Sequence, residues 1–276
     1  FSTLCRGRIV PQEIADKEAA AKFIEAVGQF ERIMNDSGFV TLTRLAASEI
    51  TGQDGKAGII EKYFSLSQTD TTCLKDIGLY PEEMRVGDDI LCLHTLSDVE
   101  DLPGKVGTDC RFEKLSTDRS DCRLSFAAPV GVLLSCNHVY NQFIFIDDHA
   151  ENLKNFEQTA RNMQSLSRYS RANQVNKEWI DEYLNEAHSK GLISVRCHCN
   201  VMAWSDDRDE LKRIRNDVGS QLALMECKPR HNTVDTPTLF WAGIPGNEAD
   251  FPAEESFYTF LGLSLIHISE PTRRRG

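Results

Sequence analysis

The second half of the chain carries the clearest pattern of apolar and polar positions. From His149 to about Ser170, apolar residues recur at steps of three and four, which predicts one face of a helix. A second helix with Trp179 among its inward residues ends at Gly191. Leu192–Trp204 then alternates, with apolar residues at every odd position from 193 on, which predicts a strand with one buried and one polar face.

A helix follows that strand. Ser205 is the expected N-cap, and acidic residues fill the first turn, where the helix dipole favours negative charge. The expected buried stripe repeats at helical spacing and consists of Leu211, Ile214, Val218, Leu222 and Met225. Glu226–His231 returns as a short strand, so residues 192–231 predict a β-α-β unit. With mixed elements upstream, the chain is expected to adopt an α+β (mixed α/β) fold.

Upstream, the pattern predicts a helix from Pro11 to about Met34 and a strand over Phe39–Leu45. Shorter elements are expected at 59–66, 90–96, 122–126 and 139–146. We expect two regions: an N-terminal mixed region, 1–146, and a helical pair with the β-α-β unit, 147–262. A further helix is expected over Ala253–Leu261.

The last fourteen residues, 263–276, do not continue this pattern. They read LSLIHISEPTRRRG, an unanchored apolar cluster followed by three arginines. The segment resembles the translation of a transposase-type sequencing adapter, and such remnants are set aside before reasoning about a fold. The alternative is a native basic tail.

Charge narrows the choice of partners. The 276 residues include 31 Lys and Arg against 42 Asp and Glu, a formal net charge of −11. Without residues 263–276 the balance is 28 basic against 41 acidic residues, or −13. With 41% hydrophobic residues, this is the composition of a soluble globular protein. Such a chain lacks the basic face that phosphate contacts need, so no direct nucleic-acid binding is expected.

Nine scattered cysteines predict reduced thiols and a cytosolic protein. The one metal-site hypothesis joins Cys197, Cys199, Cys227 and His231. Strand alternation places the first two thiols on one face and His198 on the other, so His198 cannot share their metal ion. Buried cysteines acting as small apolar residues are the preferred interpretation of these positions.

Other candidate sites are weaker. Cys136 and His138 have the spacing of a nucleophile and base on one strand face, without an acid to orient the base. The loop at 52–57 lacks the glycine spacing and the hydroxyl of a phosphate-binding loop. Asp147 or Asp148 is expected to cap the helix that follows. The residues alone therefore predict no catalytic or cofactor-binding residue.

Two stretches carry a family resemblance. One is Asn200–Trp204 (NVMAW) with the helix that follows it, Asp206–Gln221. The other is Thr236–Asn247 (TPTLFWAGIPGN), leading into Phe257–Gly262. Together with Leu4–Pro11 they resemble the region before the motor domain of TraG-family conjugative-transposon ATPases. That family is similar to the hexameric motor ATPases of type IV secretion systems.

The resemblance implies a non-catalytic domain. The family's Walker A loop would follow residue 262, so no ATP-site residue is carried over. ATP and Mg²⁺ are implied only for the full-length protein, as is a hexamer. The domain is expected to contact its own motor and membrane-embedded secretion proteins, in the cytoplasm at the inner membrane. Two alternatives remain open: an acidic soluble interaction module and a small metal-dependent enzyme.

Overall fold

The computed structural model describes residues 2–261 except 6–7, 39, 68, 70–74, 104–108, 113–115, 126 and 168. The expected tail, 263–276, therefore lies outside the described residues. Contacts within the chain divide it into two compact units, Phe1–Ile59 (unit 1) and Ile60–Gly276 (unit 2). The predicted mixed α+β fold is confirmed, because unit 2 contains an antiparallel seven-stranded sheet with helices packed on it.

Unit 1 contains β1 (Ser2–Cys5), β2 (Arg8–Pro11), α1 (Gln12–Asp36) and α2 (Ala47–Thr51). The helix predicted from Pro11 is confirmed, whereas the strand predicted at 39–45 is wrong over its described part. Residues 40–45 form no ladder. Instead, the Leu42 N–H donates to Asn35 Oδ1 (2.6 Å), and Arg44 Nε donates to Glu31 (2.7 Å). Side chains of α1 thus replace a strand partner.

The sheet and its helices follow in chain order. They are α3 (Ile59–Ser65), β3 (Ile77–Leu79), β4 (Met84–Val86), β5 (Asp89–Leu96), η1 (Val99–Asp101), β6 (Asp109–Arg111), β7 (Arg123–Ser125), α4 (Ala128–Gly131), β8 (His138–Phe145), α5 (His149–Leu166), α6 (Arg171–Lys190), β9 (Ser194–Ser205), α7 (Arg208–Leu224), β10 (Arg230–Asn232), α8 (Thr236–Ala242), η2 (Glu248–Asp250), η3 (Ala253–Glu255) and β11 (Phe257–Phe260).

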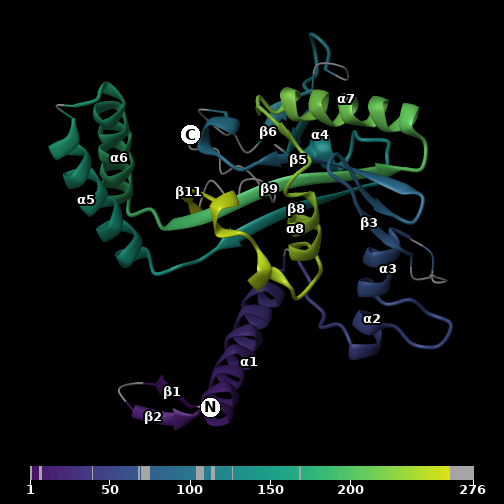
Figure 1. Ribbon diagram of the computed structural model, residues 1–276, viewed down its shortest axis with the longest axis horizontal. Coiled ribbons are helices and arrows are strands. Elements are labelled where there is room, and N and C mark those ends of the chain that lie inside the picture. The colour runs from purple at the N-terminus through teal and green to yellow at the C-terminus, as the bar shows by residue number, and fades with distance from the viewer. Residues whose placement is uncertain are drawn as a thin grey trace. The chain divides into compact units, whose positions relative to one another are not determined.

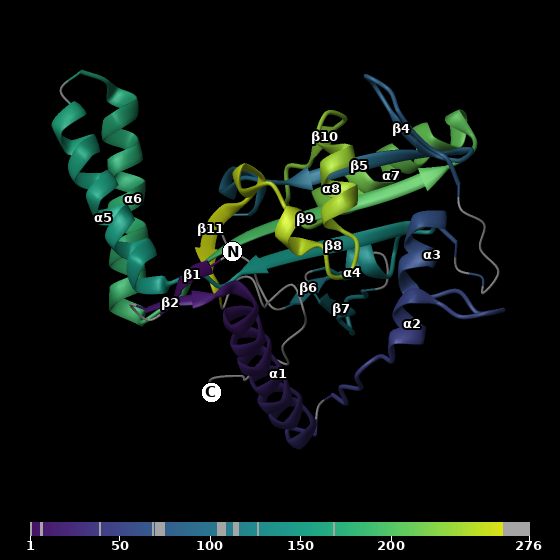
Figure 2. The same ribbon diagram turned by 60° about the horizontal axis from the view of Figure 1, so that its bottom comes forward.

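Strand β9 is the centre of the large sheet (Figure 2). Ala203 pairs with Cys92 of β5 on one side and His138 of β8 on the other. β11 also pairs with β9, while β10 and β4 pair with β5. The predicted β-α-β unit is present as β9-α7-β10, but β5 lies between its two strands. Strands on both sides of the expected boundary at residue 146 belong to this one sheet.

Both faces of β9 are buried. The odd positions from 197 to 203 pack under α7, and Cys199 and Ala203 are fully enclosed. The even positions face α8, and Met202 of β9 packs in one cluster with Phe240 of α8. Figure 1 shows the two helices on opposite sides of β9. The expectation that only one face of this strand is buried is therefore wrong, because the polar residues of the other face are hydrogen-bonded beneath α8 and the segment before β11.

Caps and ends correct two predictions and confirm a third. Asp207, not Ser205, is the N-cap of α7: its carboxylate accepts the Asp209 N–H (2.9 Å). Asp148 caps α5 as expected. The helix predicted over Ala253–Leu261 is wrong, since the chain forms a 3₁₀ turn and then β11. The aromatic residues at the two ends of β11 are buried against β9 and α6, which favours a strand there.

Candidate functional site

The structure brings together three of the four residues of the metal-site hypothesis. Cys197, Cys199 and Cys227 are each at most 4% exposed and share one apolar cluster under α7. The hydrogen bond with Cys197, followed by burial, raises the pKa of the Cys199 thiol, and burial raises the pKa of Cys227 to about 12. Nucleophilic attack needs a thiolate, so burial keeps the Cys199 and Cys227 thiols in the neutral form that is unsuited to it.

The fourth residue, His231, lies elsewhere. It pairs with His94 across β10 and β5, and the two rings meet edge to face with centroids 5.6 Å apart. Since β5 separates β10 from β9, His231 stands two strands, or roughly 10 Å, from the strand that carries Cys197 and Cys199. Within the described part of the chain, no group of three or more His, Cys, Asp or Glu side chains is arranged to hold a metal ion.

The thiol of Cys92 lies beside the His94–His231 pair. Cys92 Sγ is 3.8 Å from His94 Nδ1, and both residues are buried. Burial, together with the nearby His231 and Arg215, lowers the pKa of His94 to about 4. Burial raises the pKa of Cys92. The pair is therefore a neutral thiol and a neutral imidazole, the reverse of the charged pair that activates a cysteine nucleophile.

The pair Cys136 and His138 is not arranged for catalysis either. The His138 Nδ1 atom lies 2.9 Å from the Cys136 backbone carbonyl oxygen, an acceptor that fixes the proton on that nitrogen. Burial raises the pKa of the Cys136 thiol. Nδ1 of His138 thus donates to the backbone of Cys136 and not to its sulfur.

Sequence reasoning missed a buried polar chain on the α8 face of β9. Asn141 Nδ2 donates to Asn200 Oδ1 (3.0 Å), and Asn200 Nδ2 donates to His198 Nε2 (3.0 Å). His198 Nδ1 in turn donates to the Glu255 carbonyl oxygen (2.7 Å). Every polar group in this hydrogen-bonded series has a partner. The neutral imidazole of His198 thereby holds the segment before β11 against β9. Its role is structural.

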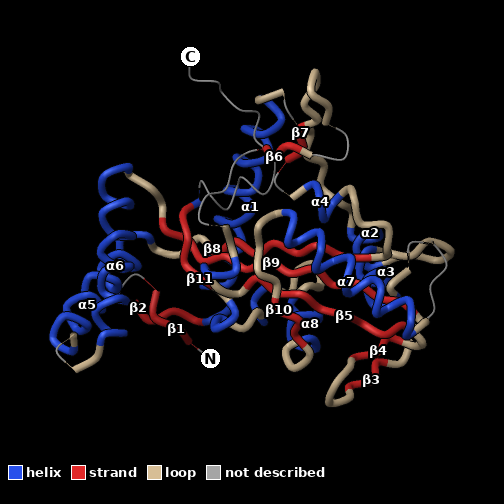
Figure 3. Tube along the Cα trace, turned by 90° about the horizontal axis from the view of Figure 1, so that it is seen from above, coloured by secondary structure: helices blue, strands red, loops and turns tan. Residues whose placement is uncertain are grey.

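The α5/α6 hairpin is the helical pair that the apolar pattern predicted, but the pattern did not predict how much of its outer end is exposed. Its two helices pack on each other and leave the sheet at the end opposite β3 and β4 (Figure 3). Trp179, expected to face inward, is 56% exposed, and Leu166 and Tyr169, which belong to the apolar face expected over 149–170, are 47% and 84% exposed. We call Leu166, Ser167 and Tyr169–Arg171 the hairpin tip. The signal that could have found it is a run without acidic residues, 158–177, in an acidic chain.

The base of the hairpin is fixed to the sheet. Tyr183 Oη lies 2.9 Å from Ser194 Oγ and 3.2 Å from the Thr259 carbonyl oxygen. The Tyr183 ring stacks on Phe260 with centroids 4.4 Å apart. The Ser194 N–H donates to His149 Nδ1 (3.0 Å) at the start of α5. Both helices are therefore held where they meet β9 and β11.

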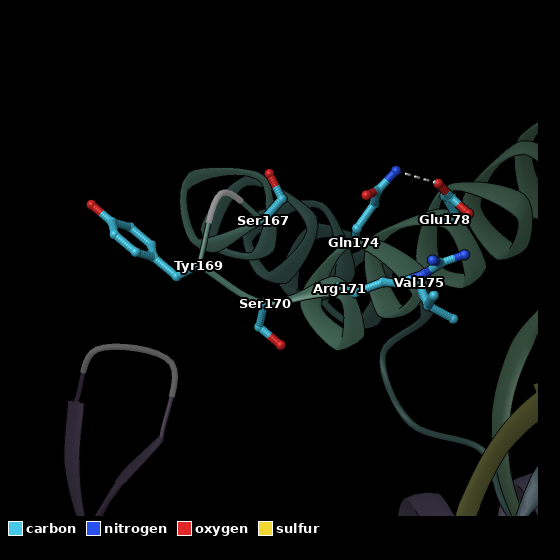
Figure 4. Close-up of a pocket in the computed structure, with 7 residues that line it drawn as sticks. All are labelled: Ser167, Tyr169, Ser170, Arg171, Gln174, Val175 and Glu178. Carbon is cyan, nitrogen blue, oxygen red and sulfur yellow. Dashed lines mark hydrogen bonds between the residues drawn. The ribbon is translucent and has the colours of Figure 1, made fainter.

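A shallow hollow of about 430 Å³ opens at the other end, beside the hairpin tip. In Figure 4 the Tyr169 ring points away from both helices, and Arg171 and Ser170 lie at the start of α6. Gln174 donates to Glu178 (3.2 Å) at the far side of the hollow. Polar side chains line most of it, so it suits a polar or charged group and not an apolar ligand.

No protein-family model matches the chain, and no curated protein matches it either. The TraG-family resemblance therefore stays a prediction. None of the described helices is long and apolar enough to cross a bilayer.

Proposed function

We propose that this chain is the non-catalytic domain that precedes the motor in a conjugative-transfer ATPase, and that it docks the motor on the secretion machinery. The family resemblance of 200–221 and 236–247 supports this assignment. The single observation that carries the docking role is the α5/α6 hairpin, which is anchored at its base and exposed at its tip.

An anchored arm suits docking for a physical reason. Tyr183 and His149 fix the base of the hairpin to the central strand, so a force or displacement at the tip is passed to β9. β9 also pairs with β11, the last described strand. In the proposed protein the motor follows β11, so one strand would connect the arm to the motor.

The remaining parts of the proposal come from the family. ATP and Mg²⁺ would bind in the motor and not in this chain. The full-length protein would form a hexamer at the cytoplasmic face of the inner membrane and contact membrane-embedded transfer proteins. The acidic composition supports the absence of direct DNA contact by this domain.

Two experiments test the assignment. Isothermal titration and a phosphate-release assay on the purified chain should detect neither ATP binding nor Mg²⁺-dependent hydrolysis. Turnover by this chain would overturn the non-catalytic role. Sequencing of the gene beyond residue 262 should find a phosphate-binding loop within a few tens of codons. A stop codon directly after that position would refute the proposed link to a motor.

A general interaction module is the second candidate, and α1 favours it. None of the described α1 side chains is buried, and its exposed large apolar residues are Ile14, Phe23, Ile24, Phe30 and Ile33. Large apolar side chains exposed in such number on one helix are typical of interaction sites. The gene sequence separates the two candidates, since only the first requires a motor.

A further inference from the structure

Charge is distributed unevenly over unit 2. The twenty residues 158–177 contain no Asp or Glu but four cations, Arg161, Arg168, Arg171 and Lys177. The rest of the chain has 27 basic and 42 acidic residues, a net charge of −15. The outer end of the α5/α6 hairpin is thus a positive region on a negative protein.

Two of the four cations are already paired. Arg161 reaches Glu157 (3.5 Å) and Lys177 reaches Asp181 (2.5 Å), one turn closer to the base in each case. Arg171 forms no ion pair with any residue that the structure describes. The acidic partners, Glu157 and Asp181, lie away from the hairpin tip, so the charge of Arg171 remains unpaired there among the described residues.

The tip also exposes apolar side chains beside this charge. Tyr169 is 84% exposed and Leu166 is 47% exposed. The hydroxyl groups of Ser167 and Ser170 line the hollow together with Arg171. Arginine and hydroxyl groups bind phosphate oxygens, while tyrosine and leucine favour the boundary between lipid headgroups and acyl chains.

Length protects the tip from the acidic body. α5 has 18 residues, so it extends about 27 Å from the sheet. The Debye length at physiological salt is about 8 Å, so repulsion between the acidic body and an anionic surface is strongly screened at that separation. The positive tip can therefore approach an anionic surface that would repel the protein as a whole.

We propose that the hairpin tip binds the surface of a bilayer that contains anionic phospholipids. Arg171 and the hydroxyl groups contact headgroup phosphates, and Tyr169 and Leu166 enter the interface. The exposed apolar pair favours lipid over nucleic acid, because a phosphate backbone offers no partner for Leu166. The inference rests on the proposed function for its setting and names a second contact of the same arm.

Vesicle sedimentation tests it on the whole chain. Vesicles of about three parts phosphatidylglycerol to seven parts phosphatidylethanolamine are compared with phosphatidylcholine alone at about 50 mM NaCl. We expect binding to the anionic vesicles only. Arg171→Glu should weaken it about thirtyfold, from about fivefold per unit charge. Arg213→Glu, on an exposed position of α7, is the matched control and should retain at least a third of the affinity.

Tyr169→Ala, which leaves the charge unchanged, should also weaken binding. Equal binding to neutral vesicles, or equal losses in Arg171→Glu and Arg213→Glu, would overturn the inference. So would tighter binding of duplex DNA that Arg171→Glu abolishes, since that outcome assigns the tip to nucleic acid. Failure here leaves the ATP and gene-sequence tests untouched, so the two proposals fail separately.

Discussion

Acidification should destabilise unit 2, because its fold keeps two buried imidazoles uncharged. His198 has no exposed surface, and its Nε2 atom accepts a hydrogen bond from Asn200 Nδ2 (3.0 Å). A proton on Nε2 would meet that N–H donor. Asn200 cannot simply turn over, because its Oδ1 atom accepts from Asn141. Burial lowers the pKa of His198 to about 4, and burial with His231 and Arg215 lowers the pKa of His94 to about 4.

The direction of the effect follows from linkage. An unfolded histidine titrates near pH 6.5, whereas these two take up protons near pH 4 in the folded chain. The unfolded state therefore binds more protons throughout this window, and stability falls as the pH drops from about 6.5 to about 4. At about pH 5 each residue costs about 2 kcal/mol, a large share of the 5–15 kcal/mol that stabilises a typical domain.

Urea titration followed by tryptophan fluorescence measures this loss. The three tryptophans, Trp179, Trp204 and Trp241, all lie in unit 2, so the signal reports this unit. Between about pH 7.5 and about pH 5, the wild-type loss should exceed that of His198→Gln by about 2 kcal/mol. The control His188→Gln, with a side chain 59% exposed, should match the wild type. An unchanged pH dependence in His198→Gln would refute the reasoning.

Two further predictions concern packing and thiol chemistry. Gly243→Ala places a Cβ 2.5 Å from the Tyr63 hydroxyl, which donates to the Phe240 carbonyl oxygen, and should cost about 1–3 kcal/mol. Gly219→Ala in α7 meets no atom within 4 Å and should stabilise by about 0.5–1 kcal/mol; thermal melts of opposite sign check both. In native protein at about pH 8, iodoacetamide should label half-buried Cys122 but not Cys227, because burial raises the pKa of Cys227 to about 12. Mass spectrometry measures the labelling at each cysteine, and faster labelling of Cys227 than of Cys122 would contradict the burial of Cys227.

The regular elements were predictable where one strong period ran along the chain. The helices from Gln12, His149 and Arg171 and the central strand followed from spacing alone. The strand predicted at 40–45 does not form because the Leu42 N–H binds the side chain of Asn35, a contact that no local sequence pattern reveals. Ala253–Leu261 failed because tertiary pairing with β9 decides its state.

The candidate site was predictable only in part. Alternation correctly placed Cys197 and Cys199 together, but the topology that puts β5 between β9 and β10 is not encoded in any local spacing, so His231 was misplaced beside them. Helical periodicity also placed Tyr169 and Trp179 on apolar faces, yet both are exposed. A period identifies an apolar face but not whether another element covers it. The run without acidic residues at 158–177 was also present in the sequence and marks the exposed outer end of the hairpin.

Transfer frequency tests the proposed docking role most directly. The intact gene carrying Tyr169→Ala with Arg171→Glu replaces the wild type in donor cells, beside an Arg213→Glu control. We expect transfer to fall about tenfold or more, while the ATPase activity of the purified full-length protein stays within about twofold. Transfer that is unchanged, or that falls equally in the control, would contradict the assignment of the docking role to the hairpin.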